Sequence, residues 1–233
     1  LQLAGLEPEP WTRAQAHFDS AADVALRLQA TRPEYPVGQL LTAQIERDRA
    51  RQLELHGQAD ASLAALNNAQ AAFEAVLERT PDSVVALSDA ALNAVFLFYE
   101  YRAEDPVRAV EWMERAIALQ DRALAEDPDN VGLLFDQGAN HGDLWYYLLL
   151  TPEAEAAMTR ERLLERALEL LGRIRELSPA LPGGYSQPIM ILLSGADHRL
   201  DTGLDAGAWI DRARSLQQSA ADAGVTLDRN IPS

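Results

Sequence analysis

Two residue types are missing from the 233-residue chain: it has no cysteine, and all 20 of its basic residues are arginine, so it has no lysine. Without cysteine there can be no disulfide, no thiolate nucleophile and no cysteine-ligated metal site. Without lysine there can be no phosphate-loop lysine, Schiff base or kinase-type catalytic lysine. A chain that lacks cysteine suits oxidising and reducing compartments alike, so this absence leaves the localisation open.

Positive charge and long apolar runs are both scarce. The 36 acidic residues outnumber the 20 basic ones and give a net charge of −16. This charge argues against nucleic acid and anionic membranes as partners, because neutralising phosphate requires clustered positive charge. The longest apolar stretch lies near 144–150, well short of the ~20 residues that span a bilayer, so we expect no membrane insertion by this segment. The chain begins at Leu1 and shows no signal peptide, and we expect it to be part of a longer protein.

Prolines mark a repeat along the chain. Pro33, Pro81, Pro128 and Pro179 stand in similar short turn segments and are separated by 48, 47 and 51 residues. Aromatic residues make up only 6% of the chain, and no run of alternating apolar and polar residues predicts a strand. We therefore expect helices between the turns.

The same apolar frame precedes each of these prolines. Apolar residues recur nine, eight and five residues before the proline, with Gln120 the single exception. Spacings of three and four residues place these positions on one stripe of a helix that ends at the proline turn. Twelve residues before the proline an alanine stands in every repeat: Ala21, Ala69, Ala116 and Ala167.

Each repeat has room for two helices, which we predict over 10–31, 36–56, 60–79, 82–102, 105–126, 129–150, 152–177, 186–199 and 205–223. The expected N-cap residues of the second helices are Asp60, Asp105, Thr151 and Asp205. The run 181–184, Leu-Pro-Gly-Gly, is expected to form a longer connection before a terminal pair, or else a hinge.

The predicted fold class is all-α, a right-handed α-solenoid of antiparallel helix pairs. We expect a single helical-repeat domain over 1–233, with a leading helix at 10–31 and helix pairs at about 36–79, 82–126, 129–177 and 186–223.

The spacing around the prolines resembles that of the tetratricopeptide-repeat family. The second helix of that repeat carries a small residue, a large aromatic one, another small one and then proline; Ala69, Phe73, Val76 and Pro81 match this frame. Ala167, Leu171, Ile174 and Pro179 match it with aliphatic substitutions. Ten residues after the proline the family places a small residue, and here stand Ala43, Ala91 and Gly138.

The repeat differs from that of the family in its length. It spans 47 to 51 residues, whereas the family's repeat has about 34, so each helix must be longer. Lengthened repeats of this kind resemble those attached to bacterial serine/threonine kinases. They also resemble, more distantly, the helical periplasmic component of certain substrate-transport systems.

Sequence motifs offer little catalytic chemistry. His17, His56, His141 and His198 lie in different predicted helices or turns, and none has a second histidine at the spacing that a helical metal site needs. No nucleophile elbow or phosphate-cradling glycine loop is present. We expect a protein that is not an enzyme and that uses no cofactor and no metal, with His141 packing on a helix face.

Aromatic residues gather at the ends of two predicted first helices, at 96–101 and 145–147. Consecutive aromatics cannot all face one core stripe, so they either pack between lengthened helices or face a ligand-contacting surface. In the tetratricopeptide family the first helices line the concave face. The resemblance implies these groove candidates: Val85, Ser88, Leu92, Val95, Phe96, Phe135, Ala139 and Asp143; the aromatic runs add Tyr99 and Tyr146.

These observations favour an interaction module that binds a protein or peptide in an apolar and aromatic groove. The acidic rim of that groove favours a partner with positive charge. A carboxylate clamp of the kind some family members use is not expected, because its lysines are missing. One alternative is a small-ligand-binding or sensory helical domain, in which the region from Phe96 to Trp145 lines a pocket. Another is an architectural spacer or oligomerisation element.

Overall fold

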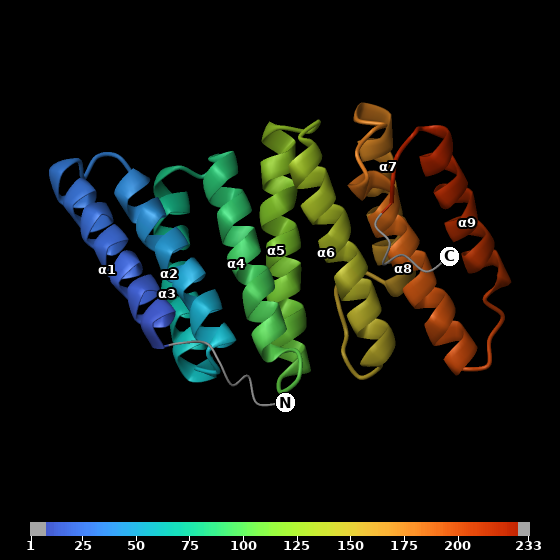
Figure 1. Cartoon of the computed structure of the whole chain (residues 1–233), viewed down its shortest axis with the longest axis horizontal. Coiled ribbons are helices and arrows are strands. Elements are labelled where there is room, and N and C mark those ends of the chain that lie inside the picture. The colour runs from blue at the N-terminus through green and yellow to red at the C-terminus, as the bar shows by residue number, and fades with distance from the viewer. Residues whose placement is uncertain (1–7, 228–233) are drawn as a thin grey trace. The chain divides into compact units, whose positions relative to one another are not determined.

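The computed structural model describes residues 8–227, and within that range all regular secondary structure is helical. The helices fall into two compact units, Leu1–Glu100 and Tyr101–Ser233. Within each unit, consecutive helices run antiparallel and pack as neighbours (Figure 1). The predicted all-α fold of antiparallel helix pairs is therefore confirmed.

Unit 1 contains four helices in its described part. They are α1 (Pro8–Thr31), α2 (Val37–Leu55), α3 (Ala59–Arg79) and α4 (Val84–Tyr101), the last residue of α4 already belonging to unit 2. α2 packs against both α1 and α3. The largest fully buried side chains of this unit are Leu66 and Phe73 of α3 and Leu87, Leu97 and Phe98 of α4.

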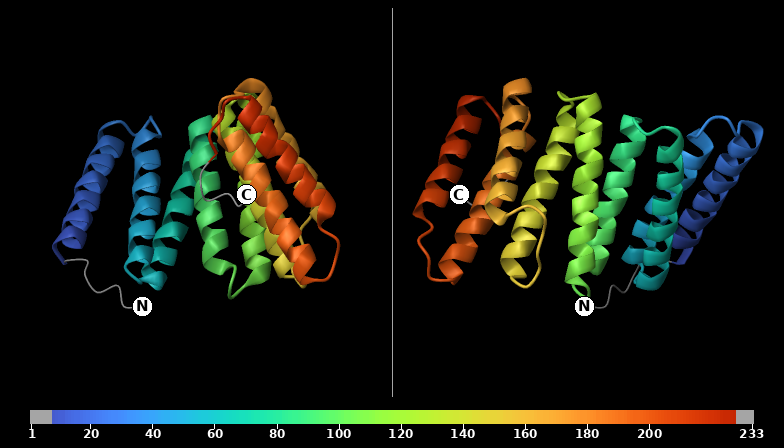
Figure 2. Two further views of the ribbon diagram at one scale, coloured as in Figure 1. Left: turned by 45° about the vertical axis from the view of Figure 1, so that its right-hand side comes forward. Right: turned by 180° about the vertical axis from the view of Figure 1, so that it is seen from behind.

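Unit 2 contains five helices in its described part. They are α5 (Pro106–Glu126), α6 (Val131–Leu150), α7 (Arg160–Leu177), α8 (Gly183–Asp201) and α9 (Gly207–Asp222). α6 packs against α5, α7 and α8, and α8 packs against α9 beside it, orange and red in Figure 2. Ile189 and Leu192 of α8 form a buried cluster with Tyr185 and with Ala213 and Ala220 of α9.

Small residues bring the helices close together at the positions that the repeat marks. Ala69, Ala116 and Ala167 are all fully buried, and so are Ala43 and Ala91. At Gly138 of α6, a Cβ atom would lie 2.8 Å from Cγ of Leu171 of α7, so only glycine permits this approach. Ala21, the first alanine of the frame, is exposed, because no helix precedes α1 in the described part of the chain.

Two of the predicted helix starts are wrong. α7 begins at Arg160 instead of 152, and its N-cap is Thr159, whose hydroxyl accepts from the Arg162 amide at 3.3 Å. The segment before it packs on α5 instead of forming a helical turn: Ala154 is buried and the Ala157 amide donates to Glu114. α8 begins at Gly183, so the run 181–184 is neither a long connection nor a hinge.

The glycines at the start of α8 reflect close packing. A Cβ at Gly183 would lie 2.9 Å from the Phe135 ring, and one at Gly184 would lie 3.2 Å from Ile174. The sequence pattern suggested chain flexibility here, but the two glycines make room for side chains of α6 and α7.

Of the four predicted N-caps, only Asp105 caps as expected, accepting from the Arg108 amide at 3.1 Å. Thr151 instead follows the C-terminus of α6. Asp60 lies inside α3, whose cap position is Gln58 with no side-chain hydrogen bond. Asp205 accepts from the Gly207 amide at 3.0 Å, although Ala206 occupies the cap position of α9.

Among the described residues, α4 alone is long and apolar enough to span a membrane by length and composition. Half of this segment is buried. A core helix has the same composition, so α4 gives no evidence of membrane insertion.

The buried alanines give a direct test of the repeat frame. Replacing Ala69 or Ala116 with leucine should lower the free energy of unfolding by ~1–3 kcal/mol, because the added methyl groups have no space at these helix contacts. Ala21→Leu occupies the same position in the frame on an exposed surface and serves as the matched control. Urea denaturation of the three variants would contradict the frame if all three unfolded at the same midpoint as the parent chain.

Candidate functional site

One side of α4 carries a row of exposed apolar residues. Val85, Leu92 and Tyr99 are 57%, 41% and 39% exposed and are spaced seven residues apart. Seven residues correspond to about two helical turns, so the three side chains lie in line along the helix. Much of the rest of α4 is buried, including Leu87, Leu97 and Phe98. The row is therefore an apolar surface on a helix that is otherwise part of the core.

The other predicted groove residues of α4 divide into accessible and inaccessible ones. Ser88 and Phe96 are half-buried on the same side as the row. The Arg51 guanidinium of α2 lies 5.9 Å from the centre of the Phe96 ring, a cation–π contact that covers part of it. Val95 is only 8% exposed, so its side chain belongs to the core and is unavailable to a partner.

Negative charge lies near the C-terminal end of this row. Burial is the main cause that raises the pKa of the Glu100 carboxyl, and repulsion by the Glu54 carboxylate of α2 raises it further. A hydrogen bond with the Ser62 hydroxyl acts in the opposite direction. The two carboxylates give this end of unit 1 a negative potential that a cationic group would relieve.

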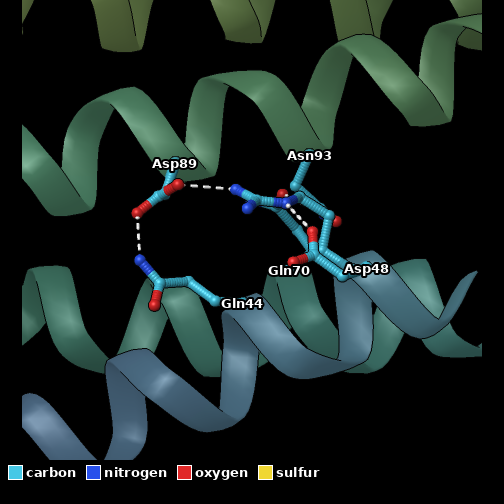
Figure 3. Close-up of polar contacts among 6 residues, drawn as sticks. Gln44, Asp48, Gln70, Asp89 and Asn93 are labelled. Carbon is cyan, nitrogen blue, oxygen red and sulfur yellow. Dashed lines mark hydrogen bonds and ion pairs between the residues drawn. The ribbon is translucent and has the colours of Figure 1, made fainter. Parts of the chain in front are cut away.

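Polar side chains that sequence reasoning missed hold α4 against α2 and α3. The Arg47 guanidinium of α2 is 10% exposed and forms a 2.6 Å ion pair with Asp89 of α4. Asp89 also accepts from the Gln44 amide at 2.6 Å, as Figure 3 shows. The same figure shows Asn93 of α4 donating to Gln70 of α3 at 3.0 Å.

A similar amide pair occurs in unit 2. Asn140 of α6 donates to Gln120 of α5 at 2.7 Å, and both side chains are buried. Asn93 and Asn140 each stand twelve residues after a repeat proline, Pro81 and Pro128. This recurrence of asparagine at one position of the repeat is the sequence signal from which the two amide pairs could have been predicted. It also explains Gln120, the single polar residue in the apolar frame, because its partner is buried with it.

The predicted residues of α6 line one side of that helix. Tyr146 is exposed, whereas Ala139 and Asp143 are half-buried. Phe135 is also half-buried, and its ring lies next to Gly183 at the start of α8. Leu150, one turn beyond Tyr146, is exposed as well.

Some members of the two aromatic runs pack inside their units, whereas Tyr99 and Tyr146 are exposed. Trp145 of α6 is buried and stacks on Trp209 of α9, with ring centres 5.6 Å apart and planes 15° from parallel. The Tyr147 hydroxyl donates to the Arg102 carbonyl at 2.9 Å. The pocket expected between Phe96 and Trp145 would draw on both units, because Phe96 belongs to unit 1 and Trp145 to unit 2.

His141 is a packing residue of α6. It is 1% exposed, and its Nδ1 donates to the Gln137 carbonyl one turn earlier, at 2.8 Å. A carbonyl can only accept, so Nδ1 carries the proton. Burial is the main cause that lowers the pKa of this imidazole, and the Arg162 and Arg166 guanidinia lower it as well. The Gln137 hydrogen bond and Asp121 act against this shift without reversing it.

In residues 8–227, no group of three or more histidine, aspartate or glutamate side chains could hold a metal ion. No protein-family model matches the sequence, and no curated protein is significantly similar to it. The crystal structure of a thermophilic tetratricopeptide-repeat protein from Thermus thermophilus is similar, with a TM-score of 0.50. The match covers 91% of this chain and 93% of that one, at 19% sequence identity.

The fold is tetratricopeptide-like. Both the proline-marked repeat and the close approach of helices at alanine and glycine positions agree with this assignment. At 19% identity the likeness concerns the fold alone, and the partner must be argued from the surfaces of this chain.

The buried imidazole predicts a pH dependence of stability. The folded state resists protonation of His141, whereas the unfolded chain takes up this proton near pH 6.5, so stability is lost as the pH falls below about 6.5. His141→Gln should lose less free energy of unfolding than the parent chain between about pH 7.5 and pH 5. Urea titrations of both proteins at the two pH values measure this difference. Equal losses would show that His141 is not buried in its neutral form.

Proposed function

We propose that this protein is a non-enzymatic interaction module that binds a protein segment on the exposed side of α4. The row of Val85, Leu92 and Tyr99 carries this proposal, because these are large apolar side chains in line on a core helix. Apolar surface of this kind, next to polar side chains, is typical of protein-binding sites. The tetratricopeptide-like fold supports the same interpretation.

The charge near the row defines the kind of partner. Burial raises the pKa of Glu100 most, and the Glu54 carboxylate lies close enough for its repulsion to raise that pKa further. An arginine or lysine of a partner would reduce that repulsion, and the net charge of −16 would speed the approach of a basic segment. The proposed partner is therefore an amphipathic segment with apolar side chains for the row and a basic residue for its Tyr99 end.

Peptides selected from a random display library on the immobilised chain would test this surface. Leu92→Asp should weaken the selected peptides about tenfold or more, because a carboxylate would then face their apolar side chains. Leu26→Asp is the matched control, since Leu26 lies on α1 of the same unit and is 57% exposed. Fluorescence anisotropy gives the dissociation constants. Equal affinity for the parent chain and Leu92→Asp would reject the row as the binding surface.

A second measurement tests the charge of the partner. Glu54→Gln should weaken a selected peptide that carries basic residues and should reduce the salt dependence of its binding. Glu78→Gln removes an exposed carboxylate from α3 of the same unit and serves as the control. Selected peptides without basic residues, bound equally by both variants, would contradict the cationic partner while leaving the apolar row in place.

A further inference from the structure

Unit 2 contains a cavity of about 270 Å³ between α6, α7, α8 and α9. One wall is the stacked pair Trp145 and Trp209, and leucines of α6, α7 and the loop before α9 contribute further apolar surface. Arg160 and Arg199 also line it. The cavity is separate from the row on α4, which belongs to unit 1.

Gly195 of α8 makes this arrangement of indoles possible. A Cβ at this position would lie 2.3 Å from Cζ3 of Trp209 and 2.8 Å from Cη2 of Trp145. Both rings therefore occupy the space that any other residue would need. The aromatic wall depends on this glycine and is part of the packed structure of unit 2.

The charges around the cavity are mainly positive. Two arginines, Arg160 and Arg199, line it against one acidic residue, Glu161. The carboxylate of nearby Asp205 accepts from the Gly207 amide, and Asp205 uses its backbone carbonyl to accept from Arg199 Nε. In a chain with 36 acidic and 20 basic residues, this excess of arginine in one cavity runs against the overall charge.

Arg160 departs from the pattern of its own helix. Three other arginines of α7 each pair with a glutamate three residues later, at Arg162–Glu165, Arg166–Glu169 and Arg173–Glu176. Three residues after Arg160 stands buried Leu163, and Arg160 forms no ion pair with any residue of the range 8–227. Its side chain is half-buried. Its guanidinium forms no ion pair with the described residues and lines the cavity, so its N–H groups can donate charge-assisted hydrogen bonds to an anionic ligand.

We infer that this cavity binds a small carboxylate that carries an aromatic ring. The guanidinium of Arg160 binds the carboxylate through charge-assisted hydrogen bonds, and Arg199 adds positive charge beside it. The ring lies against the half-buried indole of Trp209, because Trp145 is only 3% exposed and aromatic groups stack favourably. A volume of about 270 Å³ suits a ligand with one or two rings and is too small for most drug-sized molecules.

Isothermal titration calorimetry with indole-3-acetate tests this inference on the whole chain. Saturable binding is expected, and Arg160→Gln should weaken it about tenfold or more through loss of the charge-assisted hydrogen bonds. Indole-3-acetamide has the same ring without the charge and should bind the parent chain about tenfold more weakly. Arg162→Gln is the matched control, because it removes a paired, exposed arginine from the same turn of α7.

N-acetyl-tryptophan distinguishes two sources of the same chemistry, since it resembles the C-terminal residue of a peptide. If it binds more tightly than indole-3-acetate and also loses affinity in Arg160→Gln, the ligand is a chain terminus; the reverse order identifies a free acid. Three results would overturn the site: no saturable binding of either acid, equal binding of acid and amide, or equal losses in Arg160→Gln and Arg162→Gln. Leu92→Asp should bind the acids as the parent chain does, because it alters only unit 1.

Discussion

The small size of alanine and glycine at the helix contacts determines how closely the helices of this protein lie, and the other features of its two units depend on that spacing. Ala69, Ala116 and Ala167 are fully buried, and Gly138 and Gly195 leave space that larger neighbours fill. Since the chain has no cysteine, only non-covalent contacts hold the helices together, and van der Waals contact at these positions is one of them. Close approach also brings side chains from neighbouring helices within hydrogen-bonding distance, as in the pairs Gln70–Asn93 and Gln120–Asn140.

Buried polar contacts add direction to this apolar packing. The Arg47–Asp89 ion pair joins α2 to α4, while Asn93 joins α4 to α3. A helix held only by alanine and leucine contacts can slide or rotate at small cost, whereas a buried amide or guanidinium loses its partner if it moves. These contacts give α4 one orientation, and that orientation leaves Val85, Leu92 and Tyr99 on the outside. The exposed row therefore results from how α4 is held in place.

The role of each arginine, the only basic residue type of this chain besides histidine, depends on whether its surroundings are exposed or buried. Most arginines of α7 form ion pairs on the exposed side of the helix, where each pair contributes little to stability. Arg47 and Arg160 differ because their surroundings are partly or largely buried. Arg47 has Asp89 as its partner, whereas Arg160 has none among the described residues and faces a cavity with an aromatic wall. The same side chain thus serves as surface charge, as a structural contact and as the basis of the inferred anion site.

The sequence by itself determined the fold class, because the apolar frame before each proline repeats wherever a helix must bury one face. It also located most helices and the close contacts at Ala69, Ala116, Ala167 and Gly138. It placed the start of α7 wrongly, since Pro152 and Thr151 have the local chemistry of a helix start while contacts with α5 hold that segment in another conformation. For α4 and α6 it indicated the accessible sides, but Val95 falls in the core, because a shift of one position rotates a side chain by about 100°.

Only the tertiary structure decided which polar residues pair and where the cavity of unit 2 lies. Trp145, Arg160, Gly195 and Trp209 come from four different helices, and no local pattern records a meeting that packing between distant segments creates.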